Sequence, residues 1–260
     1  MLSIITVTYN AEQFLRRTLD SVWNQTSDNY EVIVVDGASK DGTSDIIREY
    51  PNRYYSSLEE AVARNVEPKS IHWISEKDNG LYDAMNKGID MAKGDFVWFM
   101  NAGDQIYDSH VIENIERHLS SMPNCDVIYG QTKIVNELGE CLGDRAKRAP
   151  EKLTLNSFLK GMVVCHQSIL VKRSLAFHYD LRYRISADFD WECRVLKVSK
   201  ANCYVDGYLS KFLCAGISSR HRKASWKERF SIMVNHFGWL KTVWSHILIA
   251  AKYPFSKKYE

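Results

Sequence analysis

Short apolar runs alternate with amphipathic segments through roughly the first hundred residues of the chain. Four runs rich in β-branched and aromatic residues predict buried strands: Leu2–Thr8, Tyr30–Val35, Ile71–Ser75 and Asp95–Met100. The segments between them predict helices over 11–24, 43–50 and 81–91, and a capping-box pattern at Ser57–Glu60 predicts a short extra helix to about Asn65. Because alternating strands and helices build βαβ units, we expect an α/β fold with a mainly parallel sheet and helices on both faces.

The second half of the chain is less regular. Its pattern predicts helices over His110–Ser121 and Ala187–Leu196, and strands over Asp126–Lys133 and His166–Lys172. With 260 residues, 45% of them hydrophobic, the chain is long enough for one large α/β domain and a helical tail.

Polar residues follow three of the predicted strands directly. They form the segments Thr8–Asn10, Asp36–Ser39 and Asn101–Asp104. In open parallel sheets ligands bind outside the carboxyl ends of the strands, so these segments mark a candidate site. Asp36 is placed either to accept hydrogen bonds from a nucleobase or ribose, or to cap a turn. Asn101 and Asp104 offer either oxygen ligands for Mg²⁺ or Mn²⁺, or a tight turn.

Several other classes of protein are disfavoured by the motifs that the sequence lacks. No GxGxxG follows the first strand and no GxxxxGK[ST] occurs, which argues against dinucleotide-binding and P-loop proteins. The six cysteines form no CxxC pair, so we expect no zinc site, and most of them fall in apolar stretches where a free cysteine behaves as a small hydrophobe. Without a basic segment followed by an apolar run at the N-terminus, we expect no signal peptide and a cytoplasmic location.

The predicted helix near residue 190 carries two acids with different expected roles. Asp190 and Arg194 are four residues apart, the spacing of an ion pair on one helix face. Asp188 lies near the helix start, where a carboxylate caps well.

Four segments, taken in order, resemble the family 2 glycosyltransferases, most closely those of bacterial exopolysaccharide and O-antigen clusters. They are Ile5–Asn10, Val34–Thr43, Asp78–Gly88 and Phe99–Asp104. The resemblance covers about residues 1 to 215 and implies the GT-A fold. It implies a nucleotide-binding half over about 1–104, an acceptor-binding half over about 105–215, and a separate tail over 216–260.

The resemblance also implies roles for individual residues. The first nucleotide-contacting segment is matched by Thr8, Tyr9, Asn10 and Glu12. Asp36 matches the acid that recognises the base, with Ser39 beside it, and Asp78 and Asn86 match polar positions flanking the nucleotide-sugar. Asn101 and Asp104 occupy the place of the metal-binding DxD element, and Asp188 matches the catalytic base. The chain departs from the family pattern at Asn101, Gly103 and Ala187, where the family commonly has acids.

The implied activity is inverting transfer of a sugar, with Mn²⁺ or Mg²⁺, from a nucleotide-sugar such as a UDP-sugar. The implied acceptor is a glycan or a polyprenyl-diphosphate-linked glycan in cell-surface polysaccharide synthesis. His166 either contacts the acceptor or is a satisfied structural histidine. Two other functions stay open: a non-catalytic homologue that binds sugar nucleotide or glycan, and a nucleotidyltransferase that makes sugar nucleotides.

The C-terminal tail is basic, whereas the rest of the chain is acidic. From Gly216 onward the sequence contains nine Lys and Arg residues and two acidic residues. This stretch therefore carries a net charge of +7, although the whole chain carries only +2. Apolar residues recur along it at helical spacing: Trp226, Phe230, Met233, Phe237, Leu240, Trp244, Ile247 and Ala251.

This stripe predicts one amphipathic helix, which Gly238 could bend. Its apolar face either enters a membrane interface, making the protein peripheral on the cell membrane, or packs on the catalytic domain or a second subunit. The segment Arg220–Lys223 is either a mobile basic loop that closes over the diphosphate or simply solvated. Nucleic-acid binding is not expected, because the strand-end segments are acidic.

Overall fold

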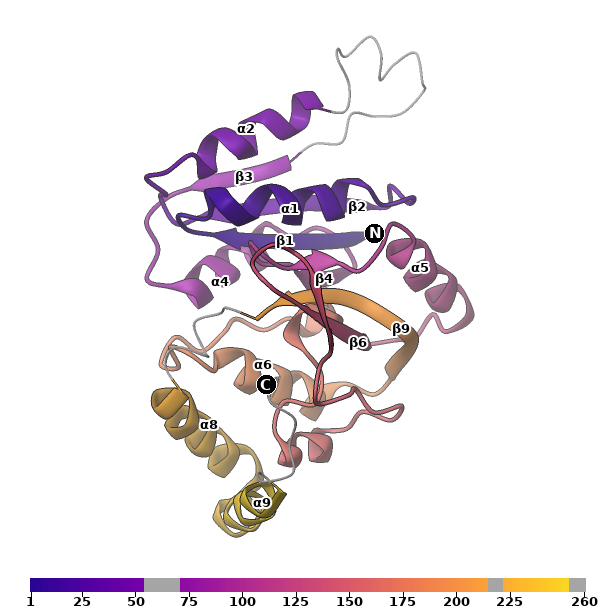
Figure 1. The fold of residues 1–260 in the computed structure, drawn as a ribbon. Coiled ribbons are helices and arrows are strands. Elements are labelled where there is room, and N and C mark those ends of the chain that lie inside the picture. Colours follow the sequence, from indigo (N-terminus) through magenta and orange to yellow (C-terminus); the bar gives the residue numbers. More distant parts are fainter. Residues whose placement is uncertain (54–70, 215–221, 253–260) are drawn as a thin grey trace.

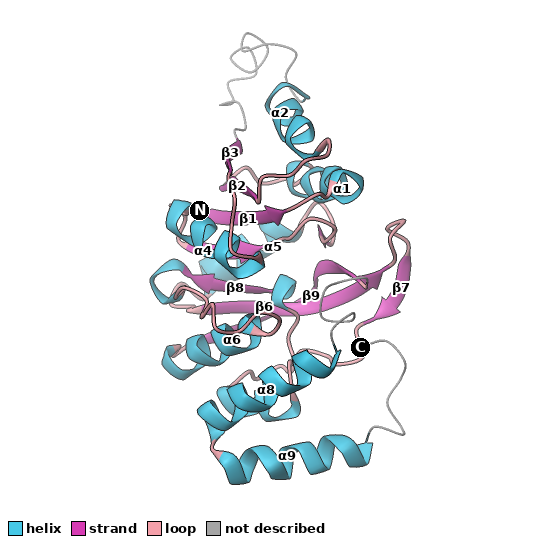
Figure 2. Ribbon diagram, turned by 90° about the vertical axis from the view of Figure 1, so that its left-hand side faces the viewer, coloured by secondary structure: helices cyan, strands magenta, loops and turns pink. Residues whose placement is uncertain are grey.

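The structure, a computed structural model, describes residues 1–53, 71–214 and 222–252. The described strands form one mixed sheet in the order β3-β2-β1-β4-β8-β6-β9-β5, with β7 paired to β6 (Figures 1 and 2). Helices α4 and α6 pack on one face of this sheet, and α1, α2 and α5 pack on the other. The mainly parallel α/β fold expected from the sequence is confirmed, with an antiparallel region added in the second half.

The first half follows the predicted pattern closely. Strands β1 (Leu2–Thr8), β2 (Tyr30–Asp36), β3 (Ile71–Ser75) and β4 (Phe96–Phe99) are all parallel. Helices α1 (Glu12–Trp23), α2 (Thr43–Arg53) and α4 (Leu81–Met91) connect or follow them. Every residue of β1 is buried, because helices cover both of its faces. The short helix predicted from Ser57 lies outside the described residues.

The second half contains α5 (Val111–Ser121), β6 (Val127–Val135), β8 (Ile169–Lys172) and α6 (Ala187–Val198), all near their predicted places. The strand predicted from His166 was placed too early, since residues His166–Ser168 form a 3₁₀ turn, η2. Two further 3₁₀ segments are η1 (Leu155–Lys160) and η3 (Arg173–Leu175). Three strands were not predicted from the sequence: β5 (Gln105–Ile106), β7 (Cys141–Asp144) and β9 (Asn202–Leu213).

Two of the six cysteines, Cys125 and Cys203, are paired, whereas the sequence predicted no disulfide. Strand β9 runs parallel to β6, with Val127 opposite Asn202. This register brings Cys125 and Cys203 face to face, with their Cα atoms 6.0 Å apart, and they form a disulfide. The pairing depends on two strands that are far apart in the sequence, so the spacing of the cysteines alone did not reveal it.

The tail forms two helices instead of the single helix predicted. Helix α8 (Arg222–Phe237) ends at Gly238, whose φ of +83° suits glycine, and α9 (Trp239–Lys252) follows. Both views place α9 at the end of the molecule opposite β3 (Figures 1 and 2). Within the described ranges, each helix falls short of the length and apolar character that crossing a bilayer requires. Of the basic segment Arg220–Lys223, residues 220 and 221 lie outside the described residues, and Arg222 and Lys223 begin α8.

Candidate functional site

A row of polar side chains crosses the sheet at the carboxyl ends of the first three strands. Thr8 pairs with Asp36 in the β1–β2 register, and Asp36 pairs with Ser75 in the β2–β3 register. The Asp36 carboxylate is fully buried, and it accepts hydrogen bonds from the hydroxyl groups of Ser39 and Ser75, the latter at 2.5 Å. The Ser39 N–H donates a third bond at 3.1 Å. These donors satisfy the buried charge, as a carboxylate at this depth requires.

Ser75 is a member of this row that the sequence analysis missed. It ends the third strand, where a serine is unremarkable as a sequence signal. Only the register of β3 against β2 places its hydroxyl on Asp36.

Hydrogen bonds join the loop after β1 to the loop after β2. The Asn10 N–H donates to Ser39 Oγ at 2.8 Å, and the Lys40 N–H donates back to Asn10 Oδ1 at 2.9 Å. Glu12 Oε2 accepts the Gly42 N–H at 3.1 Å. Asn10 and Ala38 have φ values of 47° and 59°, an uncommon conformation for residues other than glycine. Backbone strain of this kind costs on the order of 1–3 kcal/mol and clusters at ligand sites.

Gly37 lies where three predicted site segments meet. A Cβ atom there would come within 2.5 Å of Asp78 Oδ2 and within 3.3 Å of the Tyr9 ring. Tyr9 itself is 60% exposed, so its ring offers a free aromatic surface beside the buried carboxylate of Asp36. The structure therefore brings Tyr9, Asp36 and Asp78 together around one glycine.

The loop after β4 rests on helix α1. The Gly103 N–H donates to Thr18 Oγ1 at 2.8 Å, and the Thr18 hydroxyl donates to the Asn101 carbonyl at 3.4 Å. Gly103 has a φ of +108°, and a Cβ atom there would lie 2.7 Å from the Leu213 side chain. The positive φ favours glycine at this position, because a side chain would strain the backbone there whether or not Leu213 moved aside.

Asp104 and Asn101 differ in how their oxygens are occupied. Asp104 is buried, and its Oδ1 accepts the Leu213 N–H at 2.9 Å. Burial raises the pKa of this carboxyl to about 7. Asn101 Oδ1 is a buried atom to which the described residues donate no hydrogen bond. In the described part of the chain, no group of three or more His, Cys, Asp or Glu is arranged to hold a metal ion.

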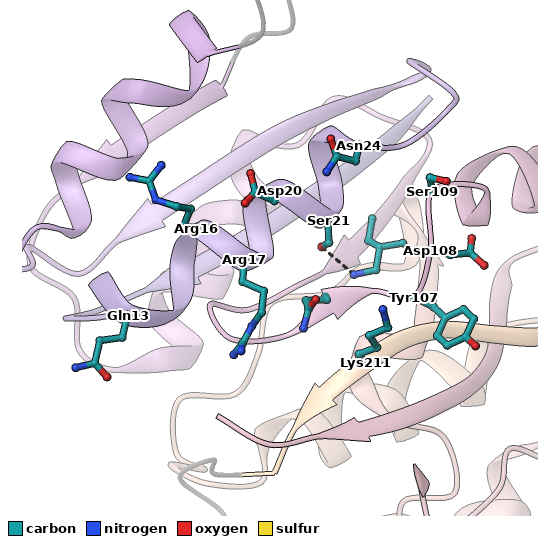
Figure 3. Close-up of a pocket in the computed structure, with 12 residues that line it drawn as sticks. Gln13, Arg16, Arg17, Asp20, Ser21, Asn24, Tyr107, Asp108, Ser109 and Lys211 are labelled. Carbon is teal, nitrogen blue, oxygen red and sulfur yellow. Dashed lines mark hydrogen bonds between the residues drawn. The ribbon is translucent and has the colours of Figure 1, made fainter. Parts of the chain in front are cut away.

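Because β2 and β4 both run parallel to β1 and flank it, Asp36 and Asp104 lie at the same edge of the sheet. Both side chains are turned into the protein. A cavity of about 520 Å³ lies elsewhere, between α1 and the β5–β9 pair, and includes Arg17, Gln105 and Lys211 (Figure 3). None of the predicted site residues lines that cavity.

Both polar atoms of the Asn86 side chain hold the backbone of the second half. Its Oδ1 accepts the Tyr179 N–H at 2.6 Å, and its Nδ2 donates to the Tyr179 carbonyl at 3.2 Å. The amide therefore fixes the segment that leads to α6 against the helix α4.

Asp188 is a half-buried carboxylate with one anchored oxygen. Its Oδ1 accepts the Tyr82 hydroxyl at 3.2 Å and the Phe189 N–H at 2.9 Å. Burial, together with the Asp188 charge, raises the pKa of Tyr82 well above its ordinary value, so Tyr82 remains a donor. The described residues provide no hydrogen bond to Oδ2.

The start of α6 is capped from helix α8 rather than by Asp188. The Glu228 carboxylate accepts the backbone N–H groups of Arg184, Ile185 and Ser186, each at 2.9 Å. A carboxylate at a helix N-terminus is favoured by the helix dipole and by the unpaired N–H groups there. No sequence pattern predicted this contact, because the partners are more than 40 positions apart.

His166 lies in a buried chain of three side chains. Its Nδ1 is 3.0 Å from Glu192 Oε1, and its Nε2 is 2.9 Å from the Tyr179 hydroxyl. Burial raises the pKa of Glu192 to about 7. Since both ring nitrogens are occupied and the residue is 4% exposed, His166 is the satisfied structural histidine of the two alternatives. The predicted Asp190–Arg194 ion pair is also present, at 2.7 Å.

Comparison with known proteins gives a consistent set of similarities. Residues 3–177 match the model of the family described as Glycosyl transferase family 2. A PGL/p-HBAD biosynthesis glycosyltransferase of Mycobacterium tuberculosis is 32% identical over 197 residues, covering 75% of this chain and 69% of the relative. A glycosyltransferase of Bacillus subtilis named for teichuronic acid biosynthesis, TuaG, is 27% identical over 66% of this chain and 62% of its own length.

Two solved structures resemble the whole described fold. The crystal structure of residues 1–349 of Staphylococcus aureus TarS matches with a TM-score of 0.67 and 16% identity, covering 100% of this chain and 75% of that one. The mannosyltransferase PcManGT of Pyrobaculum calidifontis, solved with GDP-Man and Mn²⁺, matches with a TM-score of 0.63 and 15% identity, covering 98% and 76%. At these identities the similarity is one of fold.

Proposed function

The chain belongs to glycosyltransferase family 2, as a transferase with the GT-A fold, and on this premise we propose that it transfers one sugar from a UDP-sugar with inversion. The proposed acceptor is a glycan or a polyprenyl-diphosphate-linked glycan in cell-surface polysaccharide synthesis. Relatives named for PGL and teichuronic acid biosynthesis support this class of product. Structures of TarS with UDP and with UDP-GlcNAc support the choice of donor.

In this proposal the donor binds in the first half of the chain, residues 1–104, along the two hydrogen-bonded loops after β1 and β2. Tyr9 packs against the base, and Asn10, Glu12 and Ser39 line the nucleotide beside Thr8 and Asp78. Asp36 accepts an N–H of the uracil, since each carboxylate oxygen can accept more than one hydrogen bond. Ser39 covers Asp36 in the free protein and turns aside as the base enters. Asn86 acts indirectly, by holding the backbone at Tyr179 in place.

Asp188 carries the chemical proposal, because one of its oxygens is anchored while the described residues donate no hydrogen bond to the other. Oδ2 removes the proton from an acceptor hydroxyl as that oxygen attacks the anomeric carbon. The bond from this carbon to the diphosphate breaks on the opposite side, and the nucleoside diphosphate leaves with the bonding electrons. One base therefore suffices for inversion.

Asn101 and Asp104 are proposed to hold Mn²⁺ or Mg²⁺. The unpaired buried Oδ1 of Asn101 is a hard oxygen ligand of the kind these ions prefer. When bound, the cation would neutralise charge on the departing diphosphate. The carboxyl of Asp104, raised in pKa by burial, binds such an ion only after losing its proton.

The experiment that tests this function compares Asp188→Asn with Asp206→Asn, an exposed aspartate on β9, as the matched control. We expect Asp188→Asn to lower turnover by about 10²–10⁴-fold, the usual contribution of a general base, while donor binding is kept. Donor binding is measured as the rise in unfolding temperature with UDP-sugar and Mn²⁺, because a ligand of the native state stabilises it. Unchanged turnover in Asp188→Asn would remove this residue from the mechanism.

The same thermal assay identifies the donor. Nucleotide sugars of different bases and sugars are compared with and without Mn²⁺, and we expect UDP-sugars to give the largest shift. Asp36→Asn should reduce this shift for uridine compounds, because an amide cannot replace both acceptor oxygens. A shift by GDP-sugars alone would contradict the proposed donor.

A further inference from the structure

Helix α9 carries its apolar side outward. Five large apolar side chains are between 47% and 78% exposed: Trp239, Leu240, Trp244, Ile247 and Leu248. Thr242 is fully buried and Ser245 is 8% exposed. A helix on the surface of a globular protein normally shows the opposite arrangement, with apolar residues facing the core. The orientation of α9 is therefore inverted.

Polar and aromatic contacts hold the helix in this orientation. The Ser245 hydroxyl donates to the Leu159 carbonyl of η1, and the Thr242 hydroxyl donates to the Gly238 carbonyl at 2.9 Å. The His246 ring packs against Phe230 of α8, with ring centroids 5.1 Å apart. The inward face of α9 thus has specific partners, which leaves its apolar side chains exposed. Figure 2 shows α9 at one end of the molecule.

The outward face is too apolar to be an ordinary solvated surface. Burial of a single Leu, Ile or Trp of this kind is favourable, and contiguous exposed apolar patches mark sites of interaction. Two tryptophans within the patch fit one kind of partner well, since indole rings concentrate at the boundary between lipid tails and headgroups.

The charges around the patch point to the same partner. The sequence from Arg229 to Tyr259 contains no Asp or Glu. Lys241 is exposed on α9 and Lys227 is exposed on α8. A second copy of the chain, docked face to face, would bring the same basic surface against itself and would offer these lysines no acidic partner from α9. An anionic lipid headgroup complements them.

We propose that the outward face of α9, formed by Trp239, Leu240, Trp244, Ile247 and Leu248, lies in the interface of an anionic lipid membrane. The helix lies parallel to the surface, with its apolar side chains among the lipid tails and its lysines at the headgroups. This placement holds a sugar-transferring domain next to lipid-linked molecules, but it stands independently of the proposed donor and acceptor.

The test measures flotation of the full-length protein with vesicles of phosphatidylcholine, with and without phosphatidylglycerol. We expect binding to the vesicles that contain phosphatidylglycerol and weaker binding to the neutral ones. Leu240→Asp should weaken binding at least about tenfold, because it places a charge within the inserted face. The matched control is Leu138→Asp, which makes the same change at a leucine 80% exposed, against 78% for Leu240, on the turn between β6 and β7.

Three outcomes would overturn the inference. The first is that the wild-type protein does not float with anionic vesicles, and the second is that Leu138→Asp reduces flotation as much as Leu240→Asp. The third is a dimer in the absence of lipid that Leu240→Asp dissociates, which would assign the face to a second copy. Turnover with a water-soluble acceptor, measured in parallel, should be the same for both variants and the wild type. Failure of the proposed function would appear in that measurement and leave flotation unchanged.

Discussion

Helices α8 and α9 share one apolar stripe in the sequence but use it in opposite ways. Helix α8 turns Ile232 and Met233 into the core, and it reaches α6 through Glu228 and through a 2.8 Å contact between His236 and Asp190. Helix α9 buries Thr242 and Ser245 and exposes its large apolar residues. Periodicity identifies the residues that share a helix face. The partners available to the polar residues decide the direction in which that face points.

The largest expected difference between the two helices is in stability. Ile232→Ala should lower the free energy of unfolding by about 2–5 kcal/mol, because it removes buried methyl groups and leaves a cavity. Leu240→Ala, at a side chain 78% exposed, should change it by less than about 0.5 kcal/mol. Urea denaturation of both variants measures the difference. Similar losses in the two would show that α9 is packed in solution.

The second prediction tests whether α8 supports the site. Glu228→Gln should lower the free energy of unfolding by about 2–3 kcal/mol, because three backbone N–H groups lose a charged acceptor. It should also lower kcat, because the start of α6 carries Asp188, and leave donor binding unchanged. The control is the neighbouring exposed Lys227→Gln. A normal kcat at temperatures where Glu228→Gln is fully folded would limit Glu228 to a role in stability.

The third prediction concerns the effect of pH on stability, which should act through Glu192 of α6. The folded pKa of Glu192, about 7, is above its unfolded value, so the protein holds this proton more tightly when folded. Its contribution to stability is therefore greatest at pH below about 4.5 and is lost as pH rises through about 7.

Glu192→Gln, which is neutral at every pH, should lack this loss. Its stability relative to the wild type should rise by roughly 3 kcal/mol between pH 4 and pH 8. Denaturation curves across this range test it, with the exposed Glu151→Gln expected to run parallel to the wild type. A constant difference between Glu192→Gln and wild type would contradict a raised pKa.

The smallest expected effect belongs to the charge on α9. Lys241→Gln should weaken flotation with phosphatidylglycerol vesicles by about fivefold, the effect of one basic residue near an anionic surface. Lys200→Gln, an equally simple change at an exposed lysine after α6, is the control. Added salt should reduce the difference, because it screens exposed charges. Equal flotation of both variants would show that α9 binds lipid through its apolar face alone.

Much of the first half could be predicted from the sequence because its determinants are local. The buried run of β1, the run of β2 and the helical spacing of α4 each define an element without reference to the rest of the chain. Since the strands are parallel, the positions of Thr8, Asp36 and Asp104 at one edge followed from the order of elements. The resemblance to a family then gave these residues roles that spacing alone left open.

The second half could not be predicted as well because its contacts are long-range. Strand β9 mixes Asp206, Gly207 and Lys211 with apolar residues, so its alternation is weak, yet it pairs with β6 along most of its length. The bonds from Ser75 to Asp36 and from Leu213 to Asp104 depend on pairing between distant segments. The inward direction of Ser245 on α9 likewise depends on the carbonyl of Leu159, which lies 86 positions earlier in the chain.

The long reach of β9 has a consequence for how the protein is made. The loop with Asn101 and Asp104 is closed on its far side by β5, which pairs with Ser210 and Lys211, and by the Leu213 N–H, 109 positions after Asp104. On the ribosome, strands β1 to β4 emerge long before these residues. The loop after β4 therefore lacks its contacts with β9 until the rest of the chain has been translated. A nascent chain halted before residue 210 would carry the nucleotide loops without a finished loop after β4.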